Sequence, residues 1–108
     1  MRTERPRARR YEFAANIELT DVQTELHANG RTTDVSLYGC RVVTSRPFSA
    51  GTKLRMRIAH KGGSFAALGM VAYPGRIGEI GIVFTRVEQN DQLILEKWVA
   101  ELRNELHR

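Results

Sequence analysis

Hydrophobic and polar residues alternate along several short stretches of the chain, a pattern typical of β-strands with one buried face. The clearest stretch is 54–58, where Leu54, Met56 and Ile58 alternate with two arginines. Similar alternation, or a short run of β-prone residues, predicts further strands at 13–19, 22–28, 31–36, 40–44, 66–73 and 79–85.

Turn-forming residues separate these stretches. Asn29-Gly30 is the strongest hairpin signal in the chain, and we expect it to join a strand near 22–28 to one near 31–36. Gly62-Gly63 and Pro74-Gly75 predict two more turns. Short strands with turn signals about every eight to twelve residues indicate an antiparallel sandwich or barrel.

From about Asn90 the pattern changes, and apolar residues fall at helical spacing. They are Ile94, Leu95, Trp98, Leu102 and Leu106. Asn90 or Asp91 is expected to cap the start of the helix, and Arg103 and Arg108 suit the negative end of its dipole. We expect the apolar stripe to pack on the sheet or across a barrel opening, with Trp98 in the core.

The composition is that of one folded domain, with 42% hydrophobic and 27% charged residues in a chain of 108. The charge is uneven, because residues 1–10 hold five arginines against Glu4 alone and so carry +4 of the net +5. We therefore predict a flexible, Arg-rich arm at 1–12 ahead of a nearly neutral domain at 13–108. Such an arm is either a solvated tail or a site for an anionic partner: a nucleotide, a nucleic acid or a membrane surface.

Other features restrict the function further. No stretch is apolar for long enough to cross a bilayer, and no apolar segment follows the first arginines as in a secretory signal. Cys40 is the only cysteine, and a free thiol in the core fits a cytoplasmic location. His27, His60 and His107 lack a metal-site spacing and are expected at the surface. Because no P-loop or nucleophile–base pattern is visible either, we expect no metal, no cofactor and no enzymatic activity.

Two short motifs point to a ligand. Residues 5–9 read R-P-R-A-R, an R-x-x-x-R spacing, and residues 34–39 read D-V-S-L-Y-G, a D-x-S-x-x-G spacing. In this order they resemble the two ligand motifs of the PilZ family. Residues 69–73 (G-M-V-A-Y) are similar to the late G-x-V strand of that family, and residues 81–84 (G-I-V-F) to its closing strand. The resemblance extends over roughly residues 5–105.

This resemblance implies an all-β fold with a C-terminal helix, namely a six-stranded antiparallel Greek-key β-barrel. It also implies a receptor for the second messenger cyclic di-GMP. The ligand residues that it implies are Arg5, Arg9, Asp34, Ser36 and Gly39, with Arg7, Arg10 and Arg41 as further candidates. Arg10 directly precedes Tyr11, where the family often has its second arginine, so Arg10 either replaces or assists Arg9.

The residue types suit this ligand. Guanidinium groups form paired hydrogen bonds with phosphate or with guanine O6 and N7, and they also stack on purines. The Asp34 carboxylate can accept from the N–H groups of a guanine, the Ser36 hydroxyl can bond to ligand or backbone, and Gly39 permits close approach. The alternative for these three residues is a simple turn at the end of a strand. Arg41 either points toward the ligand or lies across from a carboxylate on a neighbouring strand.

We therefore expect an adaptor that binds cyclic di-GMP, orders its arm over the barrel and acts on a protein partner in motility, biofilm or exopolysaccharide control. One alternative is a PilZ-like protein-interaction module that does not bind nucleotide. Another is a nucleic-acid binder that uses the basic arm, although we expect no sequence-specific binding to nucleic acid.

Overall fold

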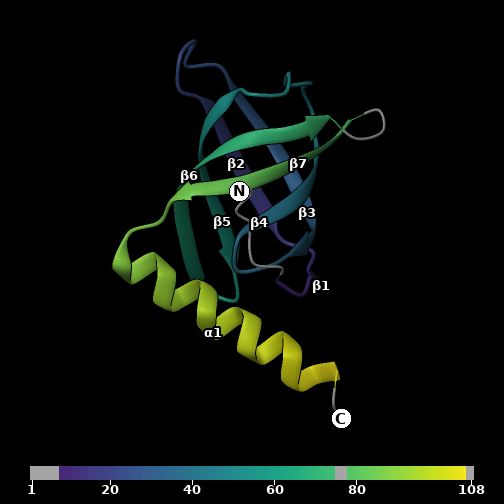
Figure 1. Ribbon diagram of the computed structural model, residues 1–108, viewed down its shortest axis with the longest axis vertical. Helices are drawn as coiled ribbons and strands as arrows, with labels where there is room; N and C mark the ends of the chain where they lie inside the picture. The colour runs from purple at the N-terminus through teal and green to yellow at the C-terminus, as the bar shows by residue number, and fades with distance from the viewer. Residues whose placement is uncertain (1–7, 75–77, 107–108) are drawn as a thin grey trace, which may run out of the picture.

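The computed structural model describes residues 8–74 and 78–106, which form seven strands and one helix (Figure 1). The elements are β1 (Tyr11–Glu12), β2 (Asn16–Asp21), β3 (His27–Val35), β4 (Gly39–Thr44), β5 (Lys53–His60), β6 (Gly63–Pro74), β7 (Glu79–Arg86) and α1 (Gln89–Leu106). The predicted strands at 13–19, 40–44, 54–58, 66–73 and 79–85 are thus present with shifted ends.

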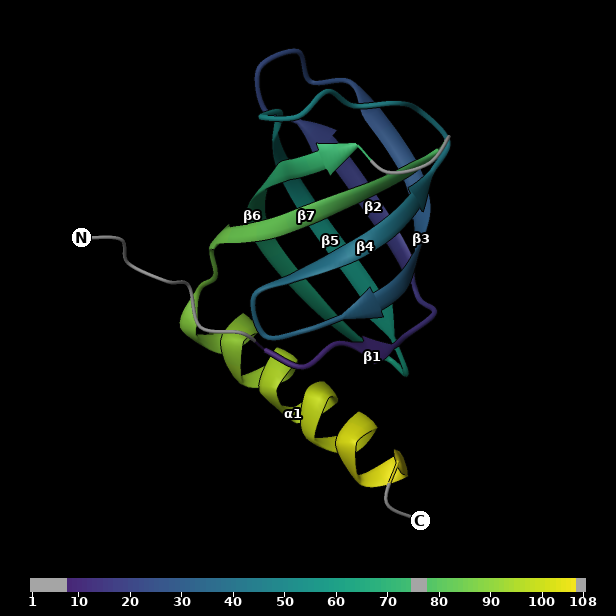
Figure 2. The same cartoon turned by 45° about the vertical axis from the view of Figure 1, so that its right-hand side comes forward.

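Six of the strands close into an antiparallel barrel, as expected (Figure 2). The pairing runs β3-β2-β5-β6-β7-β4 and returns to β3, so each of these strands has two neighbours. Strand β4 is followed in sequence by β5 but lies beside β7, which makes the topology a Greek key. The short β1 adds to the outside of this ring by pairing with the end of β3.

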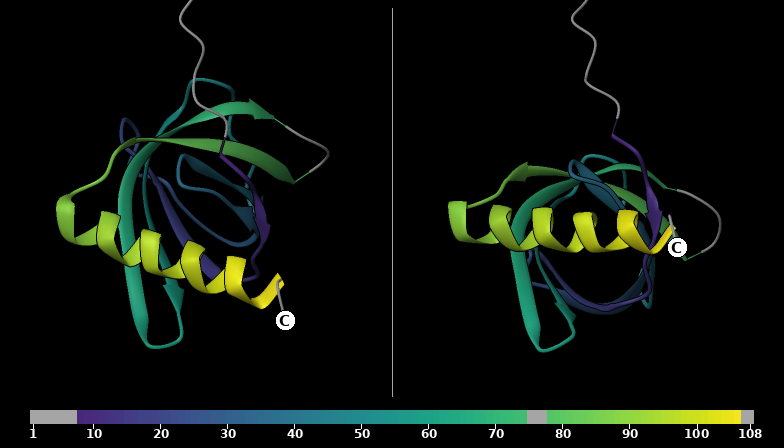
Figure 3. Two further views of the ribbon diagram at one scale, coloured as in Figure 1. Left: turned by 60° about the horizontal axis from the view of Figure 1, so that its bottom comes forward. Right: turned by 90° about the horizontal axis from the view of Figure 1, so that it is seen from below.

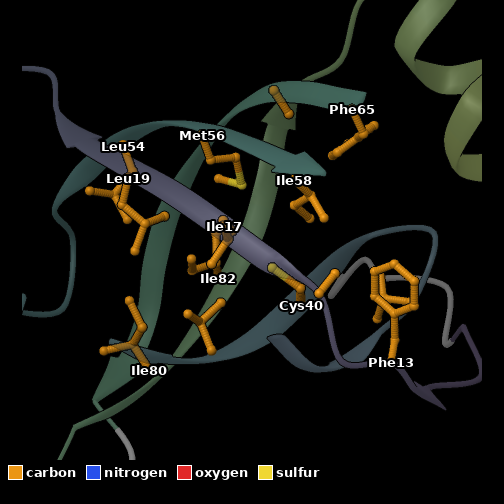
Figure 4. Packing of buried hydrophobic residues seen from close by; sticks show 14 of the residues in the cluster. Phe13, Ile17, Leu19, Cys40, Leu54, Met56, Ile58, Phe65, Ile80 and Ile82 are labelled. Carbon is orange, nitrogen blue, oxygen red and sulfur yellow. The ribbon is translucent and has the colours of Figure 1, made fainter. Parts of the chain in front are cut away.

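The core fills the barrel, and the alternation in the sequence decides which side chains enter it (Figure 4). In β5, Leu54, Met56 and Ile58 are buried, whereas the arginines between them are exposed. Cys40 is fully buried among these side chains, as predicted, and it is a free thiol. Successive strand residues point to opposite faces, so the strict alternation in β5 gives one buried and one solvated face.

The prediction of a hairpin at Asn29-Gly30 is wrong. Both residues lie inside β3, and the chain reverses at residues 22–26 instead. The Asp21 carboxylate stabilises that reversal by accepting a hydrogen bond from the Gln23 N–H at 2.8 Å. Glu25 takes the positive φ of 62° that the turn needs.

Gly30 does not form the turn that the Asn29-Gly30 pair predicted. A Cβ at this position would lie 2.5 Å from the carbonyl oxygen of Val43 on β4. The glycine therefore allows β3 and β4 to approach closely on the inside of a sharply curved barrel, and it makes no turn.

Helix α1 lies across one end of the barrel and is seen side-on when the barrel is viewed from that end (Figure 3). Leu95, Trp98 and Val99 are buried against the core, which confirms the expected core position of Trp98. Toward its C-terminal end the helix leaves the barrel, so Leu106 is 57% exposed and not part of the packed stripe. Among the described residues, no helix is both long and apolar enough to span a membrane.

Asp91 does not cap the helix. Its carboxylate accepts a hydrogen bond from the Ala66 backbone N–H at 2.8 Å, because β6 leaves this N–H without a strand partner beyond the end of β7. The contact fixes the start of α1 to β6.

His60 is also not a free surface residue. Its ring lies 4.6 Å from that of Phe13 and 5.3 Å from that of Trp98, measured between centroids. His27, which is exposed, has its Nδ1 within 2.8 Å of the Thr20 hydroxyl, and His107 lies outside the described residues.

Candidate functional site

The carboxylate of Asp34 lies at the centre of a cluster of charged side chains on the outside of the barrel. Arg10 donates from Nη1 to its Oδ1 at 2.9 Å, and Arg41 Nε lies 3.6 Å from its Oδ2. The side chain of Asp34 is 17% exposed, whereas those of Arg10 and Arg41 are about 40% exposed, at 41% and 37%. The carboxylate is thus covered largely by cations that solvent can reach.

Strand register brings these three residues together. Asp34 is paired with Arg41 across β3 and β4, and with Glu12 across β3 and β1. An irregularity in the β3–β4 pairing between Thr32 and Asp34 re-aims the carboxylate, as bulges commonly do. Because β1 fixes residues 11 and 12, the residue directly before it, Arg10, is the arginine that meets Asp34.

Arg41 is held in place by two other side chains. Its Nε donates to the hydroxyl of Tyr73 at 3.3 Å and lies 3.8 Å from the carboxylate of Glu79. The hydrogen bond with Tyr73, together with the nearby charge of Asp34, raises the pKa of Arg41 above its ordinary value. Of the two possibilities left open for Arg41, the structure shows a position near carboxylates on neighbouring strands, Asp34 and Glu79. A contact of Arg41 with a ligand stays a prediction.

Tyr73 and Glu79 were not found by sequence analysis. They flank the turn between β6 and β7, and only the closed barrel brings them to β4. Gly81 alone gave no signal of this, because its closeness to Tyr73 is visible only in the structure, where a Cβ at Gly81 would collide with the ring of Tyr73. The glycine makes room for the aromatic side chain, which stays 39% exposed beside Arg41.

Ser36 and Gly39 form the turn between β3 and β4. Ser36 donates its N–H to the Gly39 carbonyl at 2.9 Å, and its hydroxyl accepts from the Tyr38 N–H at 3.1 Å. Ser36 is buried, and a Cβ on Gly39 would collide with the carbonyl of Ile82 on β7. These residues thus build the strand-end turn that the sequence left open as the alternative to ligand contact.

The arginines of the arm fall into two groups. Arg5 and Arg7 lie outside the described residues. Arg9 does not contact Asp34 but lies over the ring of Tyr11, with its guanidinium carbon 5.5 Å from the ring centroid. Of the two arm arginines that the structure describes, Arg10 is the one that meets the D-x-S-x-x-G motif.

A cleft of about 480 Å³ separates the base of the arm from the end of α1. Its lining residues are Arg9, Arg10, Tyr11, Glu12, Leu102, Glu105 and Leu106. Arg10 lines this cleft and also contacts Asp34, so it links the cleft to the charged cluster.

The chemistry of the cluster is that of a binding site for a polar anion. Two arginines with exposed donors, one carboxylate acceptor and one exposed aromatic ring offer contacts to phosphate and to a purine. Among residues 8–74 and 78–106, no group of histidine, cysteine or carboxylate side chains could hold a metal ion.

Comparison with known proteins identifies the domain family. The sequence profile of the PilZ domain matches residues 2–101. Comparison with curated protein sequences gives no significant match.

Solved structures show the same fold at low sequence identity. The PilZ domain of YcgR from Escherichia coli, solved with c-di-GMP, has a TM-score of 0.75 and 15% identity, over 95% of each chain. The PilZ domain of CeSA, from a cellulose-synthesizing bacterium, has a TM-score of 0.71 and 18% identity, over 88% of this chain and 98% of the other. The Bacillus subtilis inhibitor of motility, MotI/DgrA, has a TM-score of 0.73 and 15% identity; it is matched by all of this chain, which spans 55% of its length. With a profile match over most of its length, the chain belongs to the PilZ domain family.

Proposed function

We propose that this protein is a cyclic di-GMP receptor that passes the signal to a protein partner and catalyses no reaction. The observation that carries the proposal is the cluster around Asp34. The first residue of the D-x-S-x-x-G motif lies on the barrel surface between Arg10 and Arg41, at the base of an arginine-rich arm. YcgR, a structural neighbour in the same family, has been solved with this nucleotide bound.

The ligand and the cluster have complementary chemistry. Cyclic di-GMP carries two phosphates and two guanines. Arg10 and Arg41 suit the phosphates and the guanine O6 and N7 atoms, and Asp34 suits the N–H donors of the guanine edge. The Tyr73 ring, next to Arg41, offers an apolar surface to a base.

Binding requires an exchange of partners at Asp34. In the free protein its Oδ1 accepts from Arg10, so a guanine that takes this acceptor releases the Arg10 guanidinium for a phosphate. The exposed ion pair costs little to break, because such pairs contribute about 0–1 kcal/mol. Charge-assisted hydrogen bonds to the ligand contribute about 1.5–3 kcal/mol each.

The arm at 1–12 takes part in this proposal. Arg5 and Arg9, with Arg7 as a further candidate, add cations that close over the bound dianion, and the arm becomes ordered. Hydrogen exchange measures this ordering. We expect slower exchange in the part of the arm that precedes β1 after nucleotide is added, since residues 11 and 12 are already paired with β3, and unchanged exchange there would contradict the ordering step.

Ser36 and Gly39 act in this proposal mainly by holding the loop. The Ser36 hydroxyl is engaged by the backbone of the turn, and Gly39 allows β4 to lie against β7. A ligand that reaches this turn meets a backbone already fixed in position, which reduces the entropy cost of binding.

The consequence of binding is a new surface, part protein and part nucleotide, that a protein partner recognises. Two structural neighbours carry titles that mention cellulose synthesis and inhibition of motility. By analogy we propose a role in motility, biofilm or exopolysaccharide control. The proposed site of action is the cytoplasm, where the free thiol of Cys40 would stay reduced.

Calorimetry tests the proposal directly. Cyclic di-GMP is titrated into the protein, with GTP as the control ligand, and into the variants Arg10→Ala, Arg9→Ala and Asp34→Ala. The matched control is Arg57→Ala, which removes an exposed arginine on β5, a strand that pairs with β2 and β6 and carries none of Arg10, Asp34 and Arg41. We expect micromolar or tighter binding, at least −8.2 kcal/mol, that is weakened roughly tenfold or more by the first and third variants.

One observation favours a second function. Asp34 and Ser36 already have partners within the chain, so the motif is accounted for without a ligand. A PilZ-like module that binds a protein and no nucleotide would have the same contacts. Absence of heat and of a thermal shift at saturating cyclic di-GMP would establish this alternative over the receptor.

A further inference from the structure

Strand β6 is apolar on both of its faces, although only one face lies in the core. Its inward residues include Phe65, Ala67 and Val71, which are buried. The residues between them are also apolar: Ala66, Leu68, Met70 and Ala72, here called the β6 outer face. They are half-buried or exposed, with Leu68 at 39%. No described strand lies over this face, and α1 meets β6 near its start, at Gly63 and Ala66. The last part of β6 crosses the front of the barrel in Figure 2.

An apolar outer row of this kind is unusual in an antiparallel barrel. A strand with one solvated face normally alternates hydrophobic and polar residues, as β5 does. Continuous apolar runs are typical of strands that are covered on both sides. Exposed apolar surface bordered by polar residues commonly marks a protein interaction site.

Cations border the β6 outer face on both sides. Leu68 is paired with Arg55 of β5 and with Arg86 of β7. Along β5, Arg57 is opposite Ala66 and Lys53 is opposite Met70. Every outward residue of β5 from 53 to 57 is therefore basic, and this basic row runs parallel to the apolar row.

The carboxylates near these cations are held weakly. Arg55 contacts Glu25 at 3.1 Å and Arg86 contacts Glu88 at 3.3 Å, but all four side chains are more than half exposed. Arg57 donates to the hydroxyl of Ser64 at 3.3 Å. Exposed ion pairs contribute about 0–1 kcal/mol, so an incoming carboxylate can replace Glu25 and Glu88 at small cost.

The surface is hollowed at one point. Where β7 ends and the chain leads into α1, a depression of about 310 Å³ is floored by Ala66, Ala67 and Leu68. Arg55 and Arg86 form part of its rim, together with Glu88, which is paired with Arg86, and Asp91, which is engaged by the Ala66 N–H. A depression of this size accommodates an apolar side chain, with a guanidinium on either side to meet carboxylates.

We propose that the β6 outer face and its bordering cations dock an acidic amphipathic segment of a partner protein. A helix with a leucine row beside a glutamate row matches the parallel apolar and basic rows, and a large apolar side chain fills the depression. The depression favours a protein side chain over the flat surface of a bilayer. None of these residues belongs to the Asp34 cluster, so the docking surface does not depend on nucleotide binding.

A designed helix serves as the probe. It is a fluorescein-labelled synthetic peptide with leucines along one face and glutamates beside them, and its counterpart has lysines in place of the glutamates. Fluorescence anisotropy measures binding of each peptide to the wild-type protein. We expect binding of the glutamate peptide only, weakened about tenfold or more by Arg55→Glu with Arg86→Glu and by Leu68→Ser.

Matched variants on β3 and β4 provide the control. Val43→Ser and Arg31→Glu change exposed residues on strands that pair with neither β5 nor β6, and both should bind the peptide as the wild type does. Thermal melts confirm that each variant is folded, and calorimetry with cyclic di-GMP shows whether its nucleotide site is intact. If the β6 variants lose peptide binding but keep nucleotide binding, the docking surface is supported independently of the nucleotide site. The same holds if the β6 variants lose peptide binding and the wild type binds no nucleotide.

Three outcomes would overturn the proposal. The first is no change in anisotropy with the glutamate peptide at its solubility limit, and the second is binding of this peptide to the β6 variants as tight as to the wild type. The third outcome is sedimentation of the protein with vesicles of phosphatidylcholine and phosphatidylglycerol in equal parts, lost in the β6 variants, without peptide binding. This last result would assign the surface to an anionic membrane.

Discussion

His60 lies at the edge of the core, between the rings of Phe13 and Trp98, at the end of the barrel that α1 covers. Burial lowers the pKa of His60, and Lys61 lowers it further, while Glu101 and Glu105 act in the opposite direction. The unfolded chain therefore takes up the proton more readily than the folded protein does.

The sign of the pH effect follows from this difference. The contribution of His60 is fully present above its ordinary pKa of about 6.5, and it is lost as the pH falls toward the lowered value. We predict that His60→Phe reduces the loss in melting temperature between about pH 7.5 and about pH 5.5. Melts of both proteins at the two pH values measure this, and an equal loss in both would contradict it.

At the scale of single residues, the sequence indicated which types of side chain meet in the charged cluster better than it indicated which individual side chains pair. The D-x-S-x-x-G motif pointed to Asp34, which lies at the centre of the charged cluster, but the R-x-x-x-R spacing pointed to Arg9, whereas Arg10 makes the ion pair. Five arginines in ten residues leave the spacing ambiguous. Only the register of β1 against β3, with Tyr11 opposite Val35, decides which guanidinium reaches the carboxylate.

The strands were predictable as elements because burial on one face imposes their alternation. The position of the chain reversal between β2 and β3 was not predictable, because two local turn signals competed. Asn29-Gly30 has the composition of a hairpin turn, yet the turn forms where the Asp21 carboxylate accepts backbone N–H groups. Gly30 is needed instead for close approach to β4, a requirement that exists only after the barrel has closed.

The contact between β4 and β7 gives a test at the scale of one element. A methyl group on Gly39 collides with the carbonyl of Ile82, which is part of the backbone and cannot rotate away. We predict that Gly39→Ala lowers the free energy of unfolding by about 1–3 kcal/mol. Gly63→Ala is the matched control, because its Cβ would meet its nearest neighbour at an ordinary 3.6 Å.

Urea denaturation of the two variants measures both effects. Gly63→Ala should stay close to the wild type, within about 0.5 kcal/mol. If Gly39→Ala is as stable as Gly63→Ala, then β4 and β7 can separate slightly without cost and the close approach is not needed for the fold.

In the molecule as a whole, α1 covers one end of a barrel that has no free edge among its six main strands. Trp98 is the largest side chain that the helix contributes to the core, and it contacts both Phe13 and Phe65. The apolar spacing in the sequence predicted that the helix packs on the barrel. It did not predict the exposed C-terminal turn of the helix, because apolar spacing cannot show where the barrel ends.

Removing this side chain should affect the entire domain. We predict that Trp98→Ala lowers the free energy of unfolding by about 3–5 kcal/mol, whereas Leu93→Ala, at a position 58% exposed, changes it by less than about 0.5 kcal/mol. Urea denaturation followed by circular dichroism compares the two. Similar losses would mean that the helix is held by its ends, such as the Asp91 contact, and not by its buried face.

The buried thiol of Cys40 allows the rate at which the barrel opens to be measured by alkylation. Burial, with a smaller contribution from Asp34, raises the pKa of this single cysteine to about 12, so an alkylating reagent finds neither access nor thiolate while the barrel is closed. We predict that the native protein is labelled only as fast as the barrel opens, and mass spectrometry can follow the reaction. A ligand that binds only the closed form would lengthen the labelling half-life by a factor of one plus the ratio of free ligand concentration to Kd, so ligands can be screened without a known partner. Fast labelling under native conditions would show that β4 leaves the barrel on its own.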